Sequence, residues 1–266
     1  MVHQQSVPVV MTFSGLDPTG GAGAQADIEA LASHGCHASP IITTMTVQDT
    51  RDVTNMVPVD GSLIIEQART ILEDMPVAAF KIGLLGSVAV VEAVHSILHD
   101  YPDVPAVVDP VLSSGAGTEL SDRAVQDALR TLLLPMTTVL TPNSLEARAL
   151  APEADTLGAC AMAILDQGCE FVLITGGHEN TPKVVNTLYG NHRQLEQFQW
   201  ERLPGSYHGS GCTLAASIAG LLAQGVEPVN AVHEAQEYTW ESLKHGYRIG
   251  MGQFIPNRLF WAKNDS

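Results

Sequence analysis

Short apolar runs alternate with amphipathic segments over most of this chain of 266 residues, and this alternation limits the possible folds more than any other feature. The apolar runs predict strands that are covered on both faces, namely Val9 to Ser14, Pro40 to Thr46, Ala79 to Leu84, Ala106 to Pro110, Thr138 to Thr141 and Phe171 to Thr175. The amphipathic segments predict helices, namely Gly23 to His34, Ser62 to Glu73, Val88 to His99, Asp122 to Leu133, Asn143 to Leu150 and Thr156 to Gln167. We therefore expect an α/β protein with a mainly parallel central sheet between two layers of helices.

The pattern changes in the last third of the chain. Val184 to Leu188 and Gln194 to Trp200 predict two strands joined by a turn at residues 190–191, which form a hairpin at the edge of the sheet. Two long helices are expected next, over Cys212 to Gln224 and Val229 to Tyr247. An eight-stranded barrel would show the same early alternation, but it does not predict a late hairpin followed by two consecutive helices.

The composition is that of one globular unit. Apolar residues make up 45% of the chain, which is enough to bury a sizeable core. The sequence shows no internal repeat, no low-complexity tract and no linker rich in proline or serine. Residues 1–266 are therefore expected to form a single domain.

The charge balance limits the possible partners. Lysine and arginine total 13 against 29 aspartates and glutamates, so the formal net charge is -16. A nucleic acid or an anionic membrane surface would be repelled at long range, and we expect neither as a partner. Small phosphorylated ligands remain compatible with this charge, because a few backbone amides can hold a phosphate inside an acidic protein.

The sequence also indicates a soluble, cytoplasmic protein. No apolar run approaches the ~18 residues needed to span a bilayer, and Met1 to Pro8 lacks the basic and apolar blocks of a signal peptide. The cysteines Cys36, Cys160, Cys169 and Cys212 form no C-x-x-C pair, which favours reduced thiols.

The segment from Gly209 to Thr213 is a candidate anion-binding site. Its two glycines let the backbone approach a ligand, and the apolar helix that follows places these amides at the positive end of a helix dipole. Cys212 lies in the same field, which is expected to favour its thiolate. The alternative is a glycine-rich turn in which Cys212 packs as a small hydrophobic side chain.

Two acidic residues follow predicted strands. Glu146 lies three residues after Asn143, and this spacing is that of a helix capping box. A carboxylate at the carboxyl end of a strand also faces the crevice where α/β sheets bind ligands, so Glu146 can have both roles. Asp109 ends the strand from Ala106 and is interpreted as either a metal ligand or a turn cap.

Other familiar sites are not indicated. The glycine-rich loop from Ser14 to Gly23 has neither the dinucleotide spacing nor the Gly-Lys-Ser/Thr ending of a P-loop. Gln48 and His178 each follow a predicted strand, where a solvent-exposed side chain is the ordinary interpretation. No spacing typical of zinc ligands occurs, and no G-x-S-x-G elbow of a hydrolase is present.

Taken together and in order, these segments resemble the ribokinase superfamily, and within it the hydroxymethylpyrimidine/phosphomethylpyrimidine kinases of thiamine biosynthesis. The matching segments are Ser14 to Gly23, Gln25 to Asp27, Thr43 to Thr50, Lys81 to Leu85, Asp109 to Val111, Thr141 to Glu146, Gly176 to His178, His208 to Leu214 and Gly250 to Gly252. The resemblance covers the chain from about residue 9 to 255. Cys212 is its most specific position, because most of the superfamily has aspartate there.

The resemblance implies a ribokinase-like fold and an activity. The expected reaction is the ATP-dependent phosphorylation of 4-amino-5-hydroxymethyl-2-methylpyrimidine (HMP) to HMP phosphate and then to HMP diphosphate. The resemblance also implies Mg²⁺ and a homodimer. Residue by residue, it implies that Cys212 is the catalytic base, flanked by the anion-binding amides of Gly209, Ser210 and Gly211.

The remaining implied site residues fall into three groups. Asn143, Glu146 and Gly177 match positions near ATP, and Asp109 with Glu146 matches the magnesium site. Gln48, Gly15, Asp27 and Leu84 match positions that contact the pyrimidine. An amide suits this ring, because Gln48 can donate to a ring nitrogen and accept from the exocyclic amine at once.

The chain departs from the family at several positions. Thr175 stands where the family commonly has a lysine, and Leu84 stands where it usually has methionine. The change at residue 84 conserves side-chain volume and is expected to be tolerated. The segment Gln253 to Arg258 differs from the Gly-Pro-rich ending of many relatives, and the sequence indicates no role for it.

Two other functions remain as alternatives. One is a pyridoxal kinase of the same superfamily. The other is a non-catalytic pyrimidine-binding regulator on the same fold. The joint presence of Cys212, Asn143, Glu146 and Asp109 favours an enzyme, because binding alone needs no phosphate-transfer groups.

Overall fold

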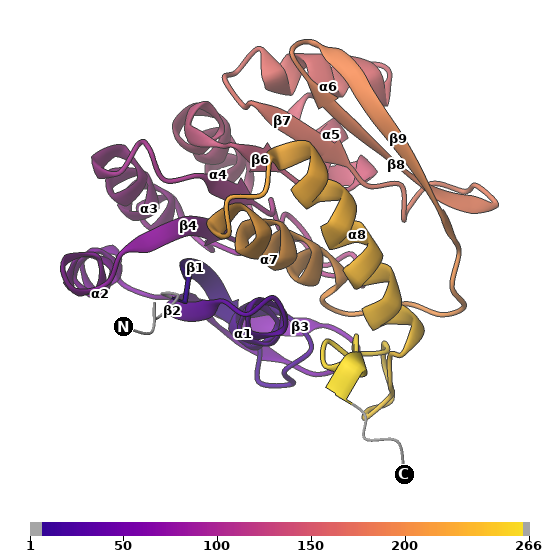
Figure 1. Ribbon diagram of the computed structural model, residues 1–266, viewed down its shortest axis with the longest axis horizontal. Coiled ribbons are helices and arrows are strands. Elements are labelled where there is room, and N and C mark those ends of the chain that lie inside the picture. The colour runs from indigo at the N-terminus through magenta and orange to yellow at the C-terminus, as the bar shows by residue number, and fades with distance from the viewer. Residues whose placement is uncertain (1–6, 263–266) are drawn as a thin grey trace, which may run out of the picture.

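The computed structural model describes residues 7–262 and shows one sheet of nine strands between two layers of helices (Figure 1). The strands are β1 (Val9–Leu16), β2 (His37–Gln48), β3 (Val53–Pro58), β4 (Val77–Ile82), β5 (Ala106–Val108), β6 (Val139–Leu140), β7 (Phe171–Ile174), β8 (Lys183–Gly190) and β9 (Arg193–Glu201). Their order across the sheet is β3-β2-β1-β4-β5-β6-β7-β8-β9. The prediction that Met1 to Pro8 is not a signal peptide concerns mostly residues 1–6. These residues lie outside the described part of the chain.

The sheet is parallel in its centre and antiparallel at both edges. The pairs from β2 through β1, β4, β5 and β6 to β7 are parallel. β3 pairs antiparallel with β2, and β8 and β9 form the antiparallel hairpin at the opposite edge. The predicted mainly parallel sheet with a late edge hairpin is therefore confirmed.

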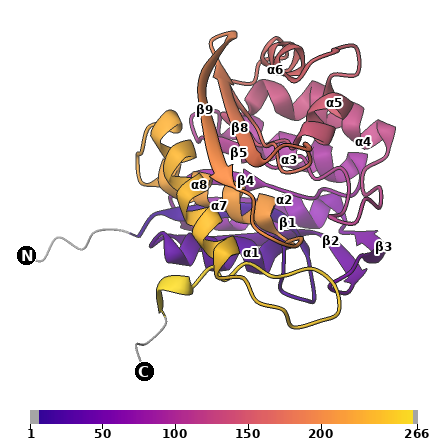
Figure 2. The same ribbon diagram turned by 90° about the vertical axis from the view of Figure 1, so that its right-hand side faces the viewer.

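Two hydrophobic clusters hold the helices against the two faces of the sheet. One face carries α1 (Gly23–Ser33), α7 (Ser210–Ala223) and α8 (Pro228–Lys244), as Figure 2 shows from the side. The other face carries α2 (Gly61–Asp74), α3 (Val88–Asp100), α4 (Arg123–Ala128), α5 (Ser144–Leu150) and α6 (Leu157–Leu165). The central strands are buried throughout because both of their faces are covered, and this explains why they are short and apolar in the sequence.

The hairpin at residues 183–201 turns tightly because two residues adopt the left-handed conformation. Asn191 and His192 have φ values of 50° and 52°, which match the twist of a two-residue hairpin turn. The turn lies one residue later than the predicted 190–191, since Gly190 still pairs with Arg193.

The sequence interpretation missed β3. The side chains of Val53–Pro58 are half-buried or exposed on both faces, so the segment shows neither an apolar run nor a clean alternation. Its antiparallel pairing with residues 44–48 of β2 makes it a strand.

Several helix boundaries also differ from prediction. The helix expected to end at Leu133 is regular only over α4, and continues as a π-turn at Leu129–Leu133 and a 3-10 turn at Leu134–Met136, where Pro135 lacks an N–H. The helix expected from Cys212 begins two residues earlier, at Ser210.

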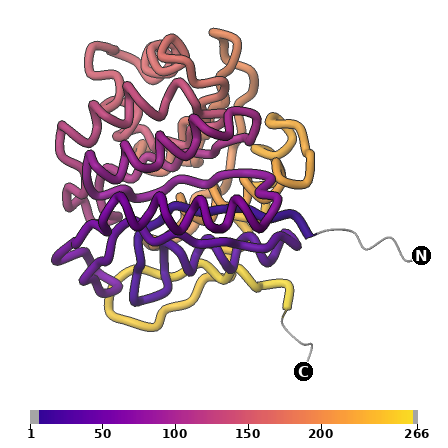
Figure 3. The backbone as a smooth tube through the Cα atoms, turned by 90° about the vertical axis from the view of Figure 1, so that its left-hand side faces the viewer, coloured from indigo at the N-terminus to yellow at the C-terminus, as the bar shows by residue number. Residues whose placement is uncertain are grey.

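The segment after α8 folds back over the beginning of the chain. Figure 3 shows it in yellow, running along the side of the indigo N-terminal elements. Gly252 and Gln253 donate backbone hydrogen bonds to Thr50, and the carbonyl of Arg258 accepts one from Ser33 of α1. Within the part of the chain described by the structure, no helix is both long enough and apolar enough to cross a membrane.

Candidate active site

A cavity of about 570 Å³ opens at the carboxyl ends of the parallel strands. β1 contributes Gly15 and β4 contributes Lys81, and Asp109 and Thr141 follow β5 and β6 directly. The N-terminus of α7 enters the same space. This is the place where open parallel sheets bind ligands, because the loops there separate to opposite faces of the sheet.

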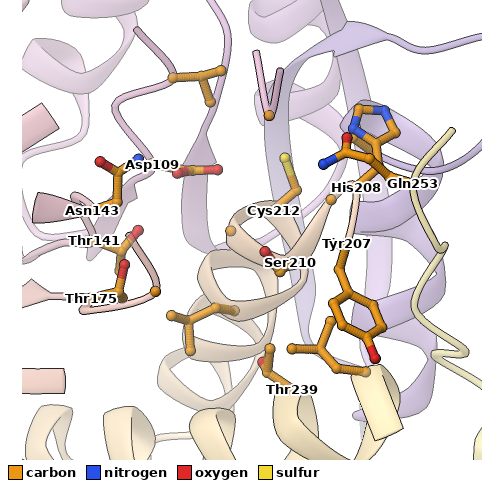
Figure 4. A pocket seen from close by; sticks show the side chains of 18 of the residues that line it. Asp109, Thr141, Asn143, Thr175, Tyr207, His208, Ser210, Cys212, Thr239 and Gln253 are labelled. Carbon is orange, nitrogen blue, oxygen red and sulfur yellow. The ribbon is translucent and has the colours of Figure 1, made fainter. Parts of the chain in front are cut away.

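Cys212 lies near the middle of the cavity lining. Figure 4 shows Asp109, Asn143 and Thr175 on one side of it, and His208 and Gln253 on the other. The cavity therefore has two ends that meet at the N-terminus of α7. Asp109, Asn143 and Thr175, which follow β5, β6 and β7, line one end. Residues of β1, β2 and the segment after α8 line the other end, together with the later part of the loop after β5.

The helix N-terminus has the geometry of an anion-binding site. Gly209 precedes α7 with φ 87°, a left-handed conformation that brings the next amides to the start of the helix. A Cβ atom at Gly209 would collide with the carbonyl oxygen of Gly21, so only glycine fits there. A Cβ atom at Gly211 would lie 3.4 Å from Oδ1 of Asp109, which shows that this carboxylate lies beside the first residues of α7.

A fully buried ion pair lies beside the cavity. Lys81 Nζ is 3.0 Å from Oδ1 of Asp27, and the same nitrogen donates to Oγ of Ser14 at 3.3 Å. Ser14 in turn donates to Asp27. Burial alone would lower the pKa of Lys81, but the charges of Asp27, Cys212 and Asp109 outweigh it and raise the pKa. The lysine is therefore a fixed cation.

The pKa of the Cys212 thiol is raised, whereas the sequence predicted that the thiolate would be favoured. Removal from water raises its pKa to about 12, and the carboxylates of Asp109 and Asp27 act in the same direction. Lys81 lowers the pKa but does not compensate. The expectation that the helix N-terminus favours the thiolate is thus wrong for the protein alone, because two carboxylates and desolvation oppose the dipole.

Glu146 forms the predicted capping box and also faces the cavity. Its Oε2 accepts the backbone N–H of Asn143 at 2.9 Å, and Oδ1 of Asn143 accepts the N–H of Glu146 at 3.0 Å, which completes the predicted capping box. The carboxylate also lines the cavity. Burial, and then the charge of Asp109, raise the pKa of Glu146 to about 8.

Asp109 and Glu146 together suit a divalent cation. Burial also raises the pKa of Asp109, so both carboxylates resist ionisation and a cation between them would relieve the penalty. Among residues 7–262 no cluster of three or more histidines, cysteines and acids suitable for a metal occurs. A pair of carboxylates still fits Mg²⁺, which in kinase sites is held by one or two carboxylates together with substrate phosphates.

The structure brings the two remaining residues predicted for ATP to one end of the cavity. Asn143 and Gly177 both line it, together with Thr175. Thr175 lies beside Asn143, because its N–H bonds to Pro142 and its carbonyl accepts from Ser144. The carbonyl of Gly177 accepts from Arg202 Nη1 at 2.9 Å, which ties this loop to the end of β9.

Three of the four residues predicted for the pyrimidine line the opposite end. Gly15, Leu84 and Gln48 face the cavity, and the absence of a side chain at Gly15 leaves room for Leu84. The Nε2 atom of Gln48 donates to Oγ1 of Thr46 at 2.7 Å. Asp27, the fourth, is fully buried and is not part of the cavity lining, so the structure places it behind Lys81.

The sequence interpretation missed a hydrogen bond that closes the glycine-rich loop. Nε2 of His208 lies 2.8 Å from Oδ2 of Asp17, whose carboxylate also accepts the backbone N–H groups of Thr19 and Ala22 at 2.8 Å. Desolvation opposes ionisation of Asp17, yet the hydrogen bonds from His208 and Thr19 hold its pKa below the usual value. The two residues are 191 positions apart, so no local signal connects them.

Gln253 and Tyr207 also line the cavity without having been predicted (Figure 4). A Cβ atom at Gly115 would lie 2.9 Å from the amide of Gln253, which places this side chain against the loop after β5. The only available signal was the unusual ending of the chain, to which the sequence assigned no role.

Comparison with known proteins identifies the family of this chain. The family model described as phosphomethylpyrimidine kinase matches residues 17–257. The chain belongs to the phosphomethylpyrimidine kinase family. It is 36% identical over 253 residues to the hydroxymethylpyrimidine/phosphomethylpyrimidine kinase of Synechococcus elongatus, covering 93% of this chain and 96% of that protein.

Two solved structures show the same fold. The phosphomethylpyrimidine kinase of Clostridium difficile has a TM-score of 0.75 and 29% identity, covering 88% of this chain and 97% of that one. The pyridoxal kinase of Bacillus subtilis, solved as an ADP complex, has a TM-score of 0.89 and 28% identity, covering 97% and 100%. The family, the ribokinase-like fold and the phosphotransferase class predicted from the sequence are confirmed, and the chain is a kinase.

The ion pair behind the cavity gives a stability prediction. Lys81→Met should lower the free energy of unfolding by about 3–5 kcal/mol, because it leaves the buried carboxylate of Asp27 without a counter-charge. The double variant Lys81→Met/Asp27→Asn should recover part of this loss. Urea denaturation measures both.

Lys244 provides the matched control, because its ion pair with Glu241 at 3.2 Å is exposed to solvent. Lys244→Met should cost no more than about 1 kcal/mol. An equal effect of Lys81→Met and Lys244→Met would contradict the assignment of Lys81 as a buried structural cation.

Proposed function

We propose that the kinase transfers the γ-phosphoryl group of ATP first to HMP and then to HMP phosphate. The observation that supports this most is the position of Cys212 and the α7 amides between two different ends of one cavity. One end has the paired carboxylates of Asp109 and Glu146, and the other has the amide of Gln48. Phosphoryl transfer needs the two substrates to bind side by side at such a position, since its acceleration comes mainly from positioning and charge stabilisation.

We assign a role to each group between the two ends of the cavity. The amides of Gly209, Ser210 and Gly211 stabilise the charge of the transferring phosphoryl group. Cys212 accepts the proton of the substrate hydroxyl in its thiolate form, and Lys81 supplies a positive charge that favours this thiolate. Because the pKa of Cys212 is about 12 in the protein alone, the thiol must first lose its own proton to solvent, and only positive charge, from Lys81 and from a bound Mg²⁺, would favour this loss.

The two substrates are assigned to opposite ends of the cavity. Asn143 and Gly177 contact ATP, and the capping geometry of Asn143 leaves its Nδ2 to donate to a phosphate. Gln48 holds the aminopyrimidine edge-on, with Gly15 and Leu84 against the ring. Asp27 acts on this site through Lys81 rather than by direct contact.

Mg²⁺ is assigned to Asp109 and Glu146. When bound with ATP, it neutralises phosphate charge during transfer. The two residues hold the ion from the protein side, and the capping bond from Asn143 fixes the carboxylate of Glu146.

We further propose that residues 1–266 act as one domain, because the cavity takes side chains from β1 and from the segment after α8.

A cytoplasmic homodimer without nucleic-acid or membrane partners remains our expectation. The exposed apolar side chains of Met45, Val47 and Val57 at the β2–β3 edge support self-association.

Pyridoxal kinase is the second candidate, favoured by the close fold similarity to the Bacillus subtilis enzyme. The discriminating experiment measures ATP consumption with HMP, HMP phosphate and pyridoxal in parallel. Turnover of both pyrimidines with a kcat/KM above that of pyridoxal supports our proposal. Turnover of pyridoxal alone would assign the chain to the second candidate, and no turnover of any of the three would reject both.

Gln48 tests the pyrimidine end. Gln48→Ala should raise the KM for HMP roughly 5- to 150-fold, because two hydrogen bonds to the ring are lost. The KM for ATP should stay within about twofold, since ATP binds at the other end. Steady-state kinetics with each substrate varied in turn measures both values, and an unchanged KM for HMP would remove Gln48 from the site.

A substitution at Glu146 distinguishes its role in helix capping from a role in metal binding. Glu146→Gln should keep much of the helix cap, because glutamine also serves at this position of a capping box. Activity should nevertheless fall at low Mg²⁺ and recover partly as Mg²⁺ rises, since the charge that holds the ion is gone. Full activity throughout a Mg²⁺ titration would restrict Glu146 to its capping role.

Cys212 tests the chemistry directly. Cys212→Ala should lower kcat by about 10²–10⁴, the usual contribution of a general base, with little change in either KM. Cys212→Asp should retain more activity than Cys212→Ala, because it restores a base. Full kcat in Cys212→Ala would mean that the thiol only packs.

The raised pKa of Cys212 predicts a pH dependence. At a pH below a pKa of about 12 the thiolate fraction rises about tenfold per pH unit, so the rate of inactivation by iodoacetamide should rise continuously from pH 7 to 9. Bound HMP should slow it. The buried thiols of Cys36, Cys160 and Cys169 should not contribute. A plateau near neutral pH would show that the thiolate already exists in the free enzyme.

A further inference from the structure

Arg258, in the segment after α8, is one of the two cationic side chains that are almost fully shielded from solvent among residues 7–262; the other is Lys81. It lines no part of the cavity. A buried guanidinium group is costly unless its donors and its charge are satisfied, so its contacts indicate what it does.

The guanidinium group joins three elements around the active site. Nε donates to Oγ1 of Thr213 in the first turn of α7 at 2.8 Å. Nη1 lies 3.1 Å from Oε2 of Glu29 in α1, and Nη2 donates to the carbonyl of Gly21 in the glycine-rich loop. The rigid fork of an arginine can hold three such acceptors in a fixed relation, which a lysine cannot.

The contact with Thr213 reaches the anion-binding amides. Oγ1 of Thr213 donates to the carbonyl of Gly209 at 2.8 Å, so Arg258 is linked through one hydroxyl to the glycine that begins α7. Gly209 packs directly against the carbonyl of Gly21, the other backbone group that Arg258 holds. The arginine thus fixes the loop from β1 and the anion-binding amides relative to each other from the buried side.

The backbone of Arg258 is itself held in place. Its carbonyl accepts from Oγ of Ser33 at 2.8 Å and from Oη of Tyr238 at 2.7 Å. The N–H of the preceding residue, Asn257, bonds to the carbonyl of Ser242. These contacts anchor the segment to α1 and α8, so the guanidinium group has a rigid base.

We propose that Arg258 is a positioning residue that sets the placement of the anion-binding amides against the substrate loop. This inference rests on the proposed phosphoryl transfer for its kinetic consequence. Its structural consequence, an ordered start of α7, is independent of the reaction. A small displacement of such amides lowers the rate of the chemical step more than it lowers substrate binding.

The kinetic experiment compares kcat and KM in a set of variants. Arg258→Ala should lower kcat by about 10- to 100-fold, while the KM for HMP changes less than about threefold. Arg258→Lys, which keeps the positive charge, should lose most of the same kcat. Glu29→Gln should lose less kcat than Arg258→Ala, because the links to Gly21 and Thr213 remain although the charge of Arg258 is left without its partner.

Arg69 is the matched control, since its ion pair with Asp100 at 3.0 Å is exposed on α2. Arg69→Ala should leave kcat unchanged. If Arg258→Ala proves too unstable to purify, Thr213→Val breaks the link between Arg258 and Gly209 and should lower kcat with little change in KM.

Hydrogen exchange supplies a readout that needs no activity. In Arg258→Lys the amides of residues 17–23 and 209–213 should exchange faster than in the wild type, while those of α8 stay unchanged. Wild-type kcat in a folded Arg258→Ala, equal losses in Glu29→Gln and Arg258→Ala, or faster exchange throughout α1, α7 and α8 would each overturn the proposal. Failure of the wild type to phosphorylate HMP would reject the proposed function and leave the exchange result to decide this inference.

Discussion

The buried ion pair between Lys81 and Asp27 is the interaction on which the site depends. It joins β4 to α1 and, through Ser14, to β1, at the edge of the sheet where the cavity begins. Neither charge could be buried there alone, because the cost of desolvation is balanced only by the partner. The ion pair therefore fixes three elements and leaves a permanent cation beside Cys212 and Asp109 in a chain of net charge -16.

The acidic groups around this cation ionise less readily than they would in water. Asp109, Glu146 and Cys212 each resist ionisation because they are withdrawn from water, and the charge of Asp109 also opposes ionisation of the other two. In our proposal the phosphates bind to the backbone amides at the start of α7, which carry no net charge and therefore do not raise the pKa of these acidic groups further. In our proposal Mg²⁺ would supply the positive charge that offsets the carboxylates of Asp109 and Glu146 and the phosphates.

The segment after α8 completes the site from the other side. Gln253 enters the cavity, and Arg258 holds the glycine-rich loop and the first turn of α7 from behind. The hydrogen bond between His208 and Asp17 joins the same two parts at the cavity surface. The anion-binding amides are thus held on both sides by contacts between segments that are distant in sequence.

Local patterns in the sequence determined the layered fold, the capping box of Asn143 and Glu146 and the glycine-rich turn before α7, because periodicity and cap residues act within a few positions. The strand β3 was decided only by its partner, since its own side chains show no clear pattern. The pairing of Lys81 with Asp27 and the contact of Arg258 with Gly21 join residues 54 and 237 positions apart. The raised pKa of Cys212 likewise depends on burial and on charges brought from other elements. Tertiary structure alone decided these features, because the energy of a charge depends on everything that surrounds it and not on its neighbours in the chain.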